Sequence, residues 1–263
     1  MAQGQVNQAE TPVQTLVEAW ELKKILKVLS IVDADVVIMP LGEKYSARLV
    51  RFEALSRDRI ALVAVDTVGL FNRLNYSIMI GSNDVRKLLK SLPWSRMLVR
   101  VVFNGAGIQV HSMDGTVSIE GSIVEKPTSI MSGLVEQLNE WHPRAIMRNV
   151  DASTLLSWFK PFSMTGLSEA HFKMLYNGFM ITTNNENALL MLDAKLVPGE
   201  YSVDGIFEVG YYLGYVTSFL EEVKRGRVNV VLGYDKPMII EASLEGKASV
   251  ETIARIVQAP RVE

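Results

Sequence analysis

Cysteine is absent from the 263-residue sequence. Disulfides, thiolate metal sites and a cysteine nucleophile are therefore excluded. The sequence also lacks a run of about 18 apolar residues, so no membrane span is expected. The first residues, Met1–Glu10, are polar and lack the apolar segment of a secretory signal, and we expect residues 1–11 to form a flexible extension. These absences favour an intracellular protein that works away from a membrane.

Patterns typical of an active site are missing as well. The three histidines, His111, His142 and His171, are scattered and lack the spacing of zinc ligands. No glycine-rich phosphate loop of the Walker or dinucleotide type occurs. The sequence therefore predicts no catalytic residue, no bound metal and no cofactor.

One apolar pattern occurs four times along the chain. Its positions follow the spacing i, i+3, i+4, i+7, which places an apolar stripe along about three turns of helix. The starts of the copies are separated by roughly a quarter of the chain, which indicates an internal repeat. The four stripes are Leu22, Ile25, Leu26 and Leu29; Val85, Leu88, Leu89 and Leu92; Ala152, Leu155, Leu156 and Phe159; and, more loosely, Leu213, Val216, Leu220 and Val223.

Strand-like segments surround each predicted helix. One precedes each helix and about three follow it, so the repeating unit is strand, helix and three strands. Pro93 and Pro161 are expected to end the second and third helices. Two units make one domain, and the fold class is α+β with two similar domains. We expect these domains at 12–124 and 144–263, joined by a connector at 125–143; the strands expected before the helices are Val13–Val17, Tyr76–Ile80, Ala145–Val150 and Tyr201–Val209.

The net charge of −2 gives no sign of a nucleic-acid binder, but the positive charges are unevenly distributed. The first two predicted helices each carry three basic residues against one acidic residue, whereas the other two are neutral. A surface shared by the helices would attract phosphate backbones without reading sequence. Lysines on an exposed helix also serve solubility, so charge alone leaves both interpretations open. The residues predicted to face nucleic acid are Lys23, Lys24, Lys27, Arg86, Lys87, Lys90, Lys160 and Lys224.

Four stretches of the chain share a pattern with one protein family. They are Leu16-Val17 with Leu22–Leu26; Ala54–Val63; Gly205–Val209 with Tyr211–Leu213; and Tyr234–Met238 with Gln258–Glu263. The last stretch, which contains Ala259-Pro260-Arg261, is the most specific. Together they resemble the DNA sliding clamps of the proliferating cell nuclear antigen (PCNA) family, in its archaeal and eukaryotic form. The resemblance extends from about Val13 to Glu263.

The resemblance implies a clamp fold in which helices line the ring and sheets lie outside. Three such subunits close a ring head to tail around duplex DNA. The edge strand near Val117–Val124 would pair with a neighbour's strand near Ala188–Asp193. A ring of this kind is not an enzyme but a processivity factor in replication and repair. The residues predicted at the subunit interface are Val117, Ile119, Ile123, Leu190 and Leu192.

Partner proteins of the family insert a short motif, with a helical turn and aromatic anchors, into a pocket beneath the connector. The resemblance implies DNA polymerase, a flap nuclease, DNA ligase and a clamp loader as partners, together with duplex DNA bound without sequence preference. It also implies a location with the chromosome, in the cytoplasm or nucleoid or in the nucleus. By matching position, the pocket walls here are Leu55, Arg59, Ile60, Pro237, Ala259 and Pro260.

The chain departs from the family pattern at three places. Leu55-Ser56 replaces the usual Met-Asp, and the predicted third helix is poor in positive charge. The connector carries Ile130, Leu134, Leu138 and Trp141, which could form a helical stripe where the family has an extended loop. A homotrimer, a heterotrimer with paralogues and a checkpoint-type clamp remain open. An enzyme of DNA metabolism is a remote alternative.

Overall fold

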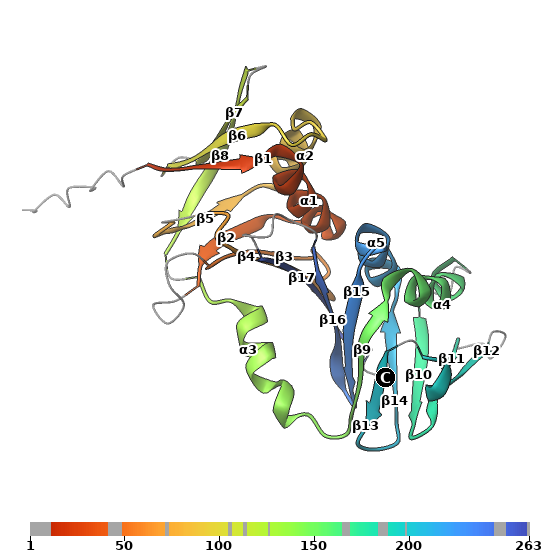
Figure 1. Cartoon of the computed structure of the whole chain (residues 1–263). Helices are drawn as coiled ribbons and strands as arrows, with labels where there is room; N and C mark the ends of the chain where they lie inside the picture. The colour runs from red at the N-terminus through yellow and green to blue at the C-terminus, as the bar shows by residue number, and fades with distance from the viewer. Residues whose placement is uncertain are drawn as a thin grey trace, which may run out of the picture.

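The computed structural model describes residues 12–41, 49–71, 74–104, 107–112, 115–125, 127–164, 169–183, 189–197, 199–244 and 251–261. The extension expected at 1–11 lies outside these ranges. Antiparallel sheets form the body of the chain. Four of its helices gather on one side of the sheets, and a fifth helix lies on the other side (Figure 1).

The N-terminal half follows the expected order of elements. A first strand and helix lead into three strands, and a second strand and helix lead into three more. These elements are β1 (Val13–Glu18), α1 (Ala19–Leu29), β2 (Val36–Pro40), β3 (Leu49–Leu55), β4 (Ala61–Val68), β5 (Ser77–Ile80), α2 (Ser82–Ser91), β6 (Leu98–Asn104), β7 (Gly107–Ser112) and β8 (Gly115–Val124).

The C-terminal half repeats this order after the helix α3 (Ile130–Gln137), which lies in the connector. Short 3-10 turns follow α1, α3 and β12. The remaining elements are β9 (Arg144–Asp151), α4 (Ala152–Met164), β10 (Glu169–Leu175), β11 (Gly178–Thr182), β12 (Leu189–Asp193), β13 (Glu200–Val203), β14 (Phe207–Tyr212), α5 (Gly214–Val223), β15 (Arg227–Gly233), β16 (Lys236–Ser243) and β17 (Glu251–Gln258).

Strand pairing shows that the two halves are built alike. In the first half β6 joins β1 to β7 and β7 pairs with β8; in the second half β15 joins β9 to β16 and β16 pairs with β17. Likewise, β5-β2-β3-β4 in the first half matches β14-β10-β11-β12 in the second. By this match, β4 is the counterpart of β12, and β17 is the counterpart of β8.

The halves are joined edge to edge by β4 and β17. These strands pair over eight residues, from Ala61↔Gln258 to Val68↔Glu251, and make a continuous 13-stranded sheet. Their counterparts are not paired with each other. Within the described residues, β12 is an edge of the four-stranded sheet, and Gly115–Glu120 of β8 pairs on one side only, with β7.

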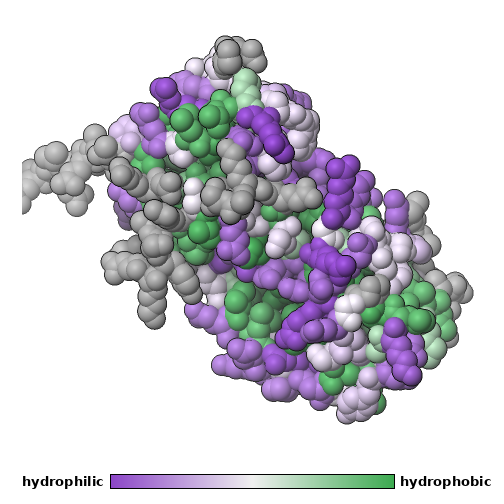
Figure 2. All heavy atoms as spheres, viewed as in Figure 1, coloured by the Kyte–Doolittle hydropathy of each residue, from purple (hydrophilic) through white to green (hydrophobic). Residues whose placement is uncertain are grey.

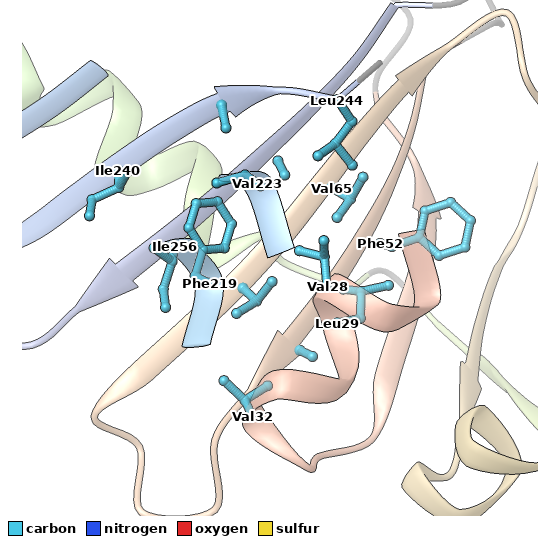
Figure 3. Close-up of a cluster of buried hydrophobic side chains, with 14 of the residues drawn as sticks. Val28, Leu29, Val32, Phe52, Val65, Phe219, Val223, Ile240, Leu244 and Ile256 are labelled. Atoms are coloured by element: carbon cyan, nitrogen blue, oxygen red, sulfur yellow. The ribbon is translucent and has the colours of Figure 1, made fainter. Parts of the chain in front are cut away.

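Apolar side chains from both halves meet beneath this joint. Val28 and Leu29 of α1 approach Phe219 and Val223 of α5, over strand residues that include Ile256 (Figure 3). All five are at most 5% exposed. The predicted helix stripes thus supply one shared core, which fixes the helices relative to the sheets.

Two sequence expectations were wrong in detail. Pro161 does not end its helix, because α4 continues to Met164. The proline is exposed, so the carbonyl that loses its donor can bond water, while Phe162 anchors the last turn at 4% exposure. The strand expected at Tyr201–Val209 is two strands, β13 and β14. It breaks at Asp204, whose carboxylate accepts a 2.5 Å hydrogen bond from the backbone N–H of Arg144.

Candidate nucleic-acid face and partner groove

The four amphipathic helices lie in one row, in the order α2, α1, α5, α4. Each contacts the next, although α1 and α5 come from different halves of the chain. All four lie on the same side of the sheets (Figure 1). Since their apolar stripes are largely buried, their polar sides share a surface. We call this surface the helix face.

Most of the basic residues predicted on the helix face contact neighbouring groups. Lys27 pairs with Glu222 at 2.8 Å and Lys160 with Glu221 at 3.5 Å, so α5 supplies acidic partners to helices on both sides. Arg86 pairs with Asp33. These ion pairs were not predicted from the sequence, since the residues that pair are far apart along the chain.

Two lysines in the middle of α1 each lie over a tryptophan ring. Lys23 Nζ donates a 2.5 Å hydrogen bond to the Leu92 carbonyl and lies 5.0 Å from the Trp94 ring centroid. Lys24 Nζ lies 5.9 Å from the Trp20 ring centroid. Such cation–π contacts hold the ammonium groups on this part of the surface without neutralising them.

The remaining predicted basic residues are Lys87 and Lys90 of α2, at one end of the row, and Lys224, directly after α5. Lys87 Nζ donates a 3.2 Å hydrogen bond to the Ser118 carbonyl of β8, and Lys90 and Lys224 are exposed. The helix face is therefore a mixed surface with interleaved ion pairs. It is less basic than the count of lysines alone indicates.

The opposite face of the sheet carries a row of apolar residues in direct cross-strand register. Leu55 lies beside Leu62, Leu62 beside Val257, and Val257 beside Ile239. The connector covers this row. Met131 and Trp141 are 0% and 3% exposed there, and Leu134 and Leu138 pack against the same cluster.

Predicted pocket residues form the next row on this face. Ile60, Ala259 and Pro237 each lie two residues from a member of the apolar row, and alternation along a strand places them on the same side. The backbone N–H of Ala259 donates to the Ile60 carbonyl at 2.7 Å. All three are half-buried, so the second row stays partly open. We call the two rows together the outer groove.

The other predicted pocket residues take different positions. Leu55 belongs to the covered row and also lines a hollow of about 350 Å³ beside the start of α3, with Met39, Leu62 and Ile130. Arg59 is exposed and has a positive φ of 60°. Pro260 forms an isolated bridge with Tyr211. The structure thus gathers Leu55, Ile60, Pro237 and Ala259 and leaves Arg59 at the rim.

A buried charged network holds the start of α3 on the sheet. Arg51 donates to both carboxylate oxygens of Asp66, at 2.6 and 2.8 Å, and to the hydroxyls of Ser129 and Ser132. Glu53 accepts from Ser129 Oγ at 2.8 Å and from the Ile130 N–H at 2.9 Å. An anionic group at a helix N-terminus is favourable, so this network fixes both the place and the direction of α3.

The turn between β3 and β4 is tied to α5. Asp58 accepts hydrogen bonds from Ser56 Oγ at 2.5 Å and from the Tyr215 hydroxyl at 3.1 Å. Burial raises the pKa of the Asp58 carboxyl, but bonds from Ser56, the Ile60 N–H and Tyr215 outweigh it and hold the pKa below its ordinary value of 3.8. The turn that carries Arg59 and Ile60 is thereby anchored to the helix face.

The predicted interface residues lie on β8 and β12. Within the described residues, β12 pairs only with β11, and Gly115–Glu120 of β8 pairs only with β7, whereas Ile123 lies where β8 also pairs with β5. Leu190 and Leu192 of β12 are half-buried, as is Val117 of β8, while Ile119 is 4% exposed and Ile123 is 42% exposed. In β12 the alternate residues Leu189 and Met191 are 61% and 65% exposed. An edge strand with apolar side chains on both faces favours pairing with another strand.

The described part of the chain contains no group of three or more metal-ligating side chains. None of the described helices is long and apolar enough to cross a membrane.

Comparison with protein-family models finds no match to this sequence, and comparison with curated protein sequences finds none either. Solved structures, in contrast, match over nearly the whole chain. PCNA of A. fulgidus bound to the C-terminal region of FEN-1 aligns with a TM-score of 0.68 at 14% identity, covering 95% of this chain and 99% of that one. PCNA of Thermococcus kodakaraensis gives 0.67 at 15% identity, covering 95% and 100%. PCNA of Entamoeba histolytica gives 0.64 at 15% identity, covering 97% and 100%. The chain therefore has the fold of the PCNA sliding clamps.

Proposed function

We propose that this chain is a subunit of a ring-shaped sliding clamp, a protein without catalytic activity that encircles duplex DNA and tethers replication and repair enzymes to it. The observation that carries the proposal is the β4–β17 joint. This joint is one half-to-half contact made inside the chain. Within one chain, β8 and β12 lie at opposite ends. Their pairing, the counterpart of the β4–β17 joint, can therefore form only between two chains.

Repetition of the same joint between copies closes a ring. If β8 of one subunit meets β12 of the next as β17 meets β4, every junction is alike and the contact is head to tail. Three subunits with two halves each give six similar halves, and their helix faces together contain twelve helices. The helix face then lines the hole, where loosely held lysines meet phosphates without base readout.

The outer groove supports the partner part of the proposal. It is an apolar surface with half-buried residues close to the C-terminal tail, and such a surface suits an apolar peptide motif. The A. fulgidus PCNA structure contains a segment of FEN-1. We propose that flap nucleases, DNA polymerases and DNA ligase dock here through short motifs, that a clamp loader opens the ring, and that the protein resides with the chromosome.

A topological experiment tests this function. The protein is incubated with nicked circular DNA and then challenged with about 1 M NaCl, at which charge contacts are screened. A sliding ring stays on the circle and leaves when a restriction enzyme linearises the DNA. Salt-resistant binding that survives linearisation, or no salt-resistant binding after addition of a clamp loader, would contradict the proposal.

The same preparation distinguishes a homotrimer from a mixed ring. Sedimentation of the purified chain alone gives three times the 29.3 kDa subunit mass if the ring is made of identical copies. A monomer that assembles only with a paralogue indicates a heteromeric or checkpoint-type clamp.

A further inference from the structure

The connector is folded onto the surface where a partner motif is proposed to bind. Met131 of α3 is fully buried, and Trp141, just beyond the helix, is 3% exposed. Both belong to one buried apolar cluster with Leu62, Val257 and Ile239. The neighbouring row of the outer groove remains half-open. The connector of the same chain, with helix α3, therefore covers one of the two rows of the outer groove.

We propose that α3 is a displaceable occupant of the outer groove, and that partners bind as an amphipathic helix that replaces it. This inference rests on the proposed clamp function and names the partner chemistry of the same groove. The alternative, a groove closed permanently by α3, leaves only the half-buried row of Ile60, Pro237 and Ala259 for a motif.

The contacts of α3 show what a replacing helix must carry. Met131 and Leu134 of α3 and Leu138, the first residue of the 3-10 turn after it, follow the spacing i, i+3, i+7, which lays one stripe on the row below. A hydroxyl at the N-cap bonds both Arg51 and Glu53, each of which would otherwise lose a buried hydrogen-bond partner. An aromatic residue completes the contact at the far end. The expected partner is a helix with an N-cap serine or threonine, this apolar stripe and a terminal aromatic ring.

Several features of α3 favour its release. It is eight residues long, which is too short to be a stable helix on its own. Gly133 weakens it further, and nothing lies within 4 Å of the place where a Cβ would stand. Ile130 and Val135 are 48% and 38% exposed, so α3 leaves apolar surface uncovered even when docked (Figure 2). A partner that also covers Ile60 and Ala259 gains contacts that α3 does not make.

The test measures binding of a probe helix in trans. The probe is a fluorescein-labelled peptide with the sequence of residues 127–141 of this chain, and binding is followed by polarisation against the assembled protein. Met131→Ser with Leu134→Ser loosens α3, so we expect the probe to bind at least about tenfold more tightly than to the wild type. Gly133→Ala stabilises α3 and should weaken probe binding about fivefold.

Matched controls make the result specific. Val135→Ser removes an exposed apolar residue from the same helix and should leave the affinity unchanged. A probe carrying Met131→Ser should bind the loosened protein at least about tenfold less tightly. If the loosened protein does not fold, Ser132→Ala, which removes one bond from Arg51, takes its place. Equal probe affinity for the loosened and the Gly133→Ala proteins would overturn the proposal. If the protein passes the topological test but the two variants bind the probe equally, the α3 inference is wrong and the proposed clamp function stands.

Discussion

Asp151 shows how one carboxylate defines the start of a helix. Its Oδ1 accepts hydrogen bonds from Ser153 Oγ at 2.5 Å and from the backbone N–H of Thr154 at 2.9 Å, as an N-cap does. The bond from Ser153 is the main cause that holds the pKa of Asp151 below its ordinary value of 3.8. A carboxyl with a lowered pKa stabilises the folded state above its unfolded pKa, and this contribution is lost as pH falls through the folded pKa.

We therefore predict that Asp151→Ala lowers the free energy of unfolding at pH 7 by about 1 kcal/mol. Asp151→Asn keeps an acceptor and should lose less. The difference between wild type and Asp151→Asn should begin to shrink below about pH 4, where the unfolded carboxyl takes up a proton, and should be lost as pH falls through the lower pKa of the folded state. Urea denaturation at neutral and acidic pH measures both effects, and an Asp151→Ala protein as stable as the wild type at pH 7 would count against the cap.

Arg51 is at the centre of the buried charged network that holds the start of α3 on the sheet. Its side chain is 6% exposed and binds Asp66, Ser129 and Ser132. We predict that Arg51→Met costs about 3 kcal/mol of stability, because it leaves part of a buried carboxylate unpaired. Arg255, which also binds Asp66 at 2.5 Å, keeps the loss at the lower end of the range.

Hydrogen exchange distinguishes the network from a general loss of stability. Amides of α3 should exchange faster in Arg51→Met than those of α2, which lies on the other face of the sheets. Arg57→Met, at an exposed arginine beside the hollow, is the matched control and should change neither measurement. Equal acceleration in α2 and α3 would mean that the network does not hold the connector.

At the scale of elements, the sequence predicted what local periodicity determines. The stripe from Leu22 to Leu29 and its later copies gave the helices on the correct faces, since each stripe is buried against the sheets. The prediction that Pro161 ends its helix was wrong, because the carbonyl that loses its donor is near solvent and can bond water instead. The sequence did not decide whether the connector is a loop or a helix, because its helix is held by Arg51 and Glu53, which are far away in the sequence. The salt bridges of α5 were missed for the same reason.

Strand β11 contains a position at which only glycine fits. Gly178 has φ of +151°, and a Cβ there would lie 1.9 Å from the Leu192 carbonyl oxygen of β12. We predict that Gly178→Ala destabilises the protein by more than about 1 kcal/mol and separates β12 from β11. Gly115→Ala, with a φ of +140° but no neighbour within 4 Å, isolates the backbone strain without the clash. Thermal unfolding of the two variants measures the difference, and equal melting temperatures would refute it.

At the scale of the whole molecule, the proposed ring depends on β12 as an edge strand. Its half-buried Leu190 points toward the core side of the sheet, where a neighbour's Val117 and Ile119 would extend the same apolar layer. A charge at this position would have to be buried in every junction of the ring. It would remain close to water in a free subunit, because β12 has no second strand beside it within the described residues.

We predict that Leu190→Glu shifts the protein from the ring to single subunits and abolishes retention on circular DNA. Sedimentation at several concentrations measures the shift, and amide exchange of β16 and β17, far from the edge, reports whether the subunit is still folded. Lys195→Glu adds a negative charge on an exposed residue just beyond β12 and should leave the mass unchanged. A Leu190→Glu protein that sediments as the wild type would show that β12 is not the closing edge. The reason is that a charge buried at every β8–β12 contact weakens an apolar layer that is continuous with the core. An unchanged mass would therefore mean that the ring junction does not repeat the β4–β17 joint.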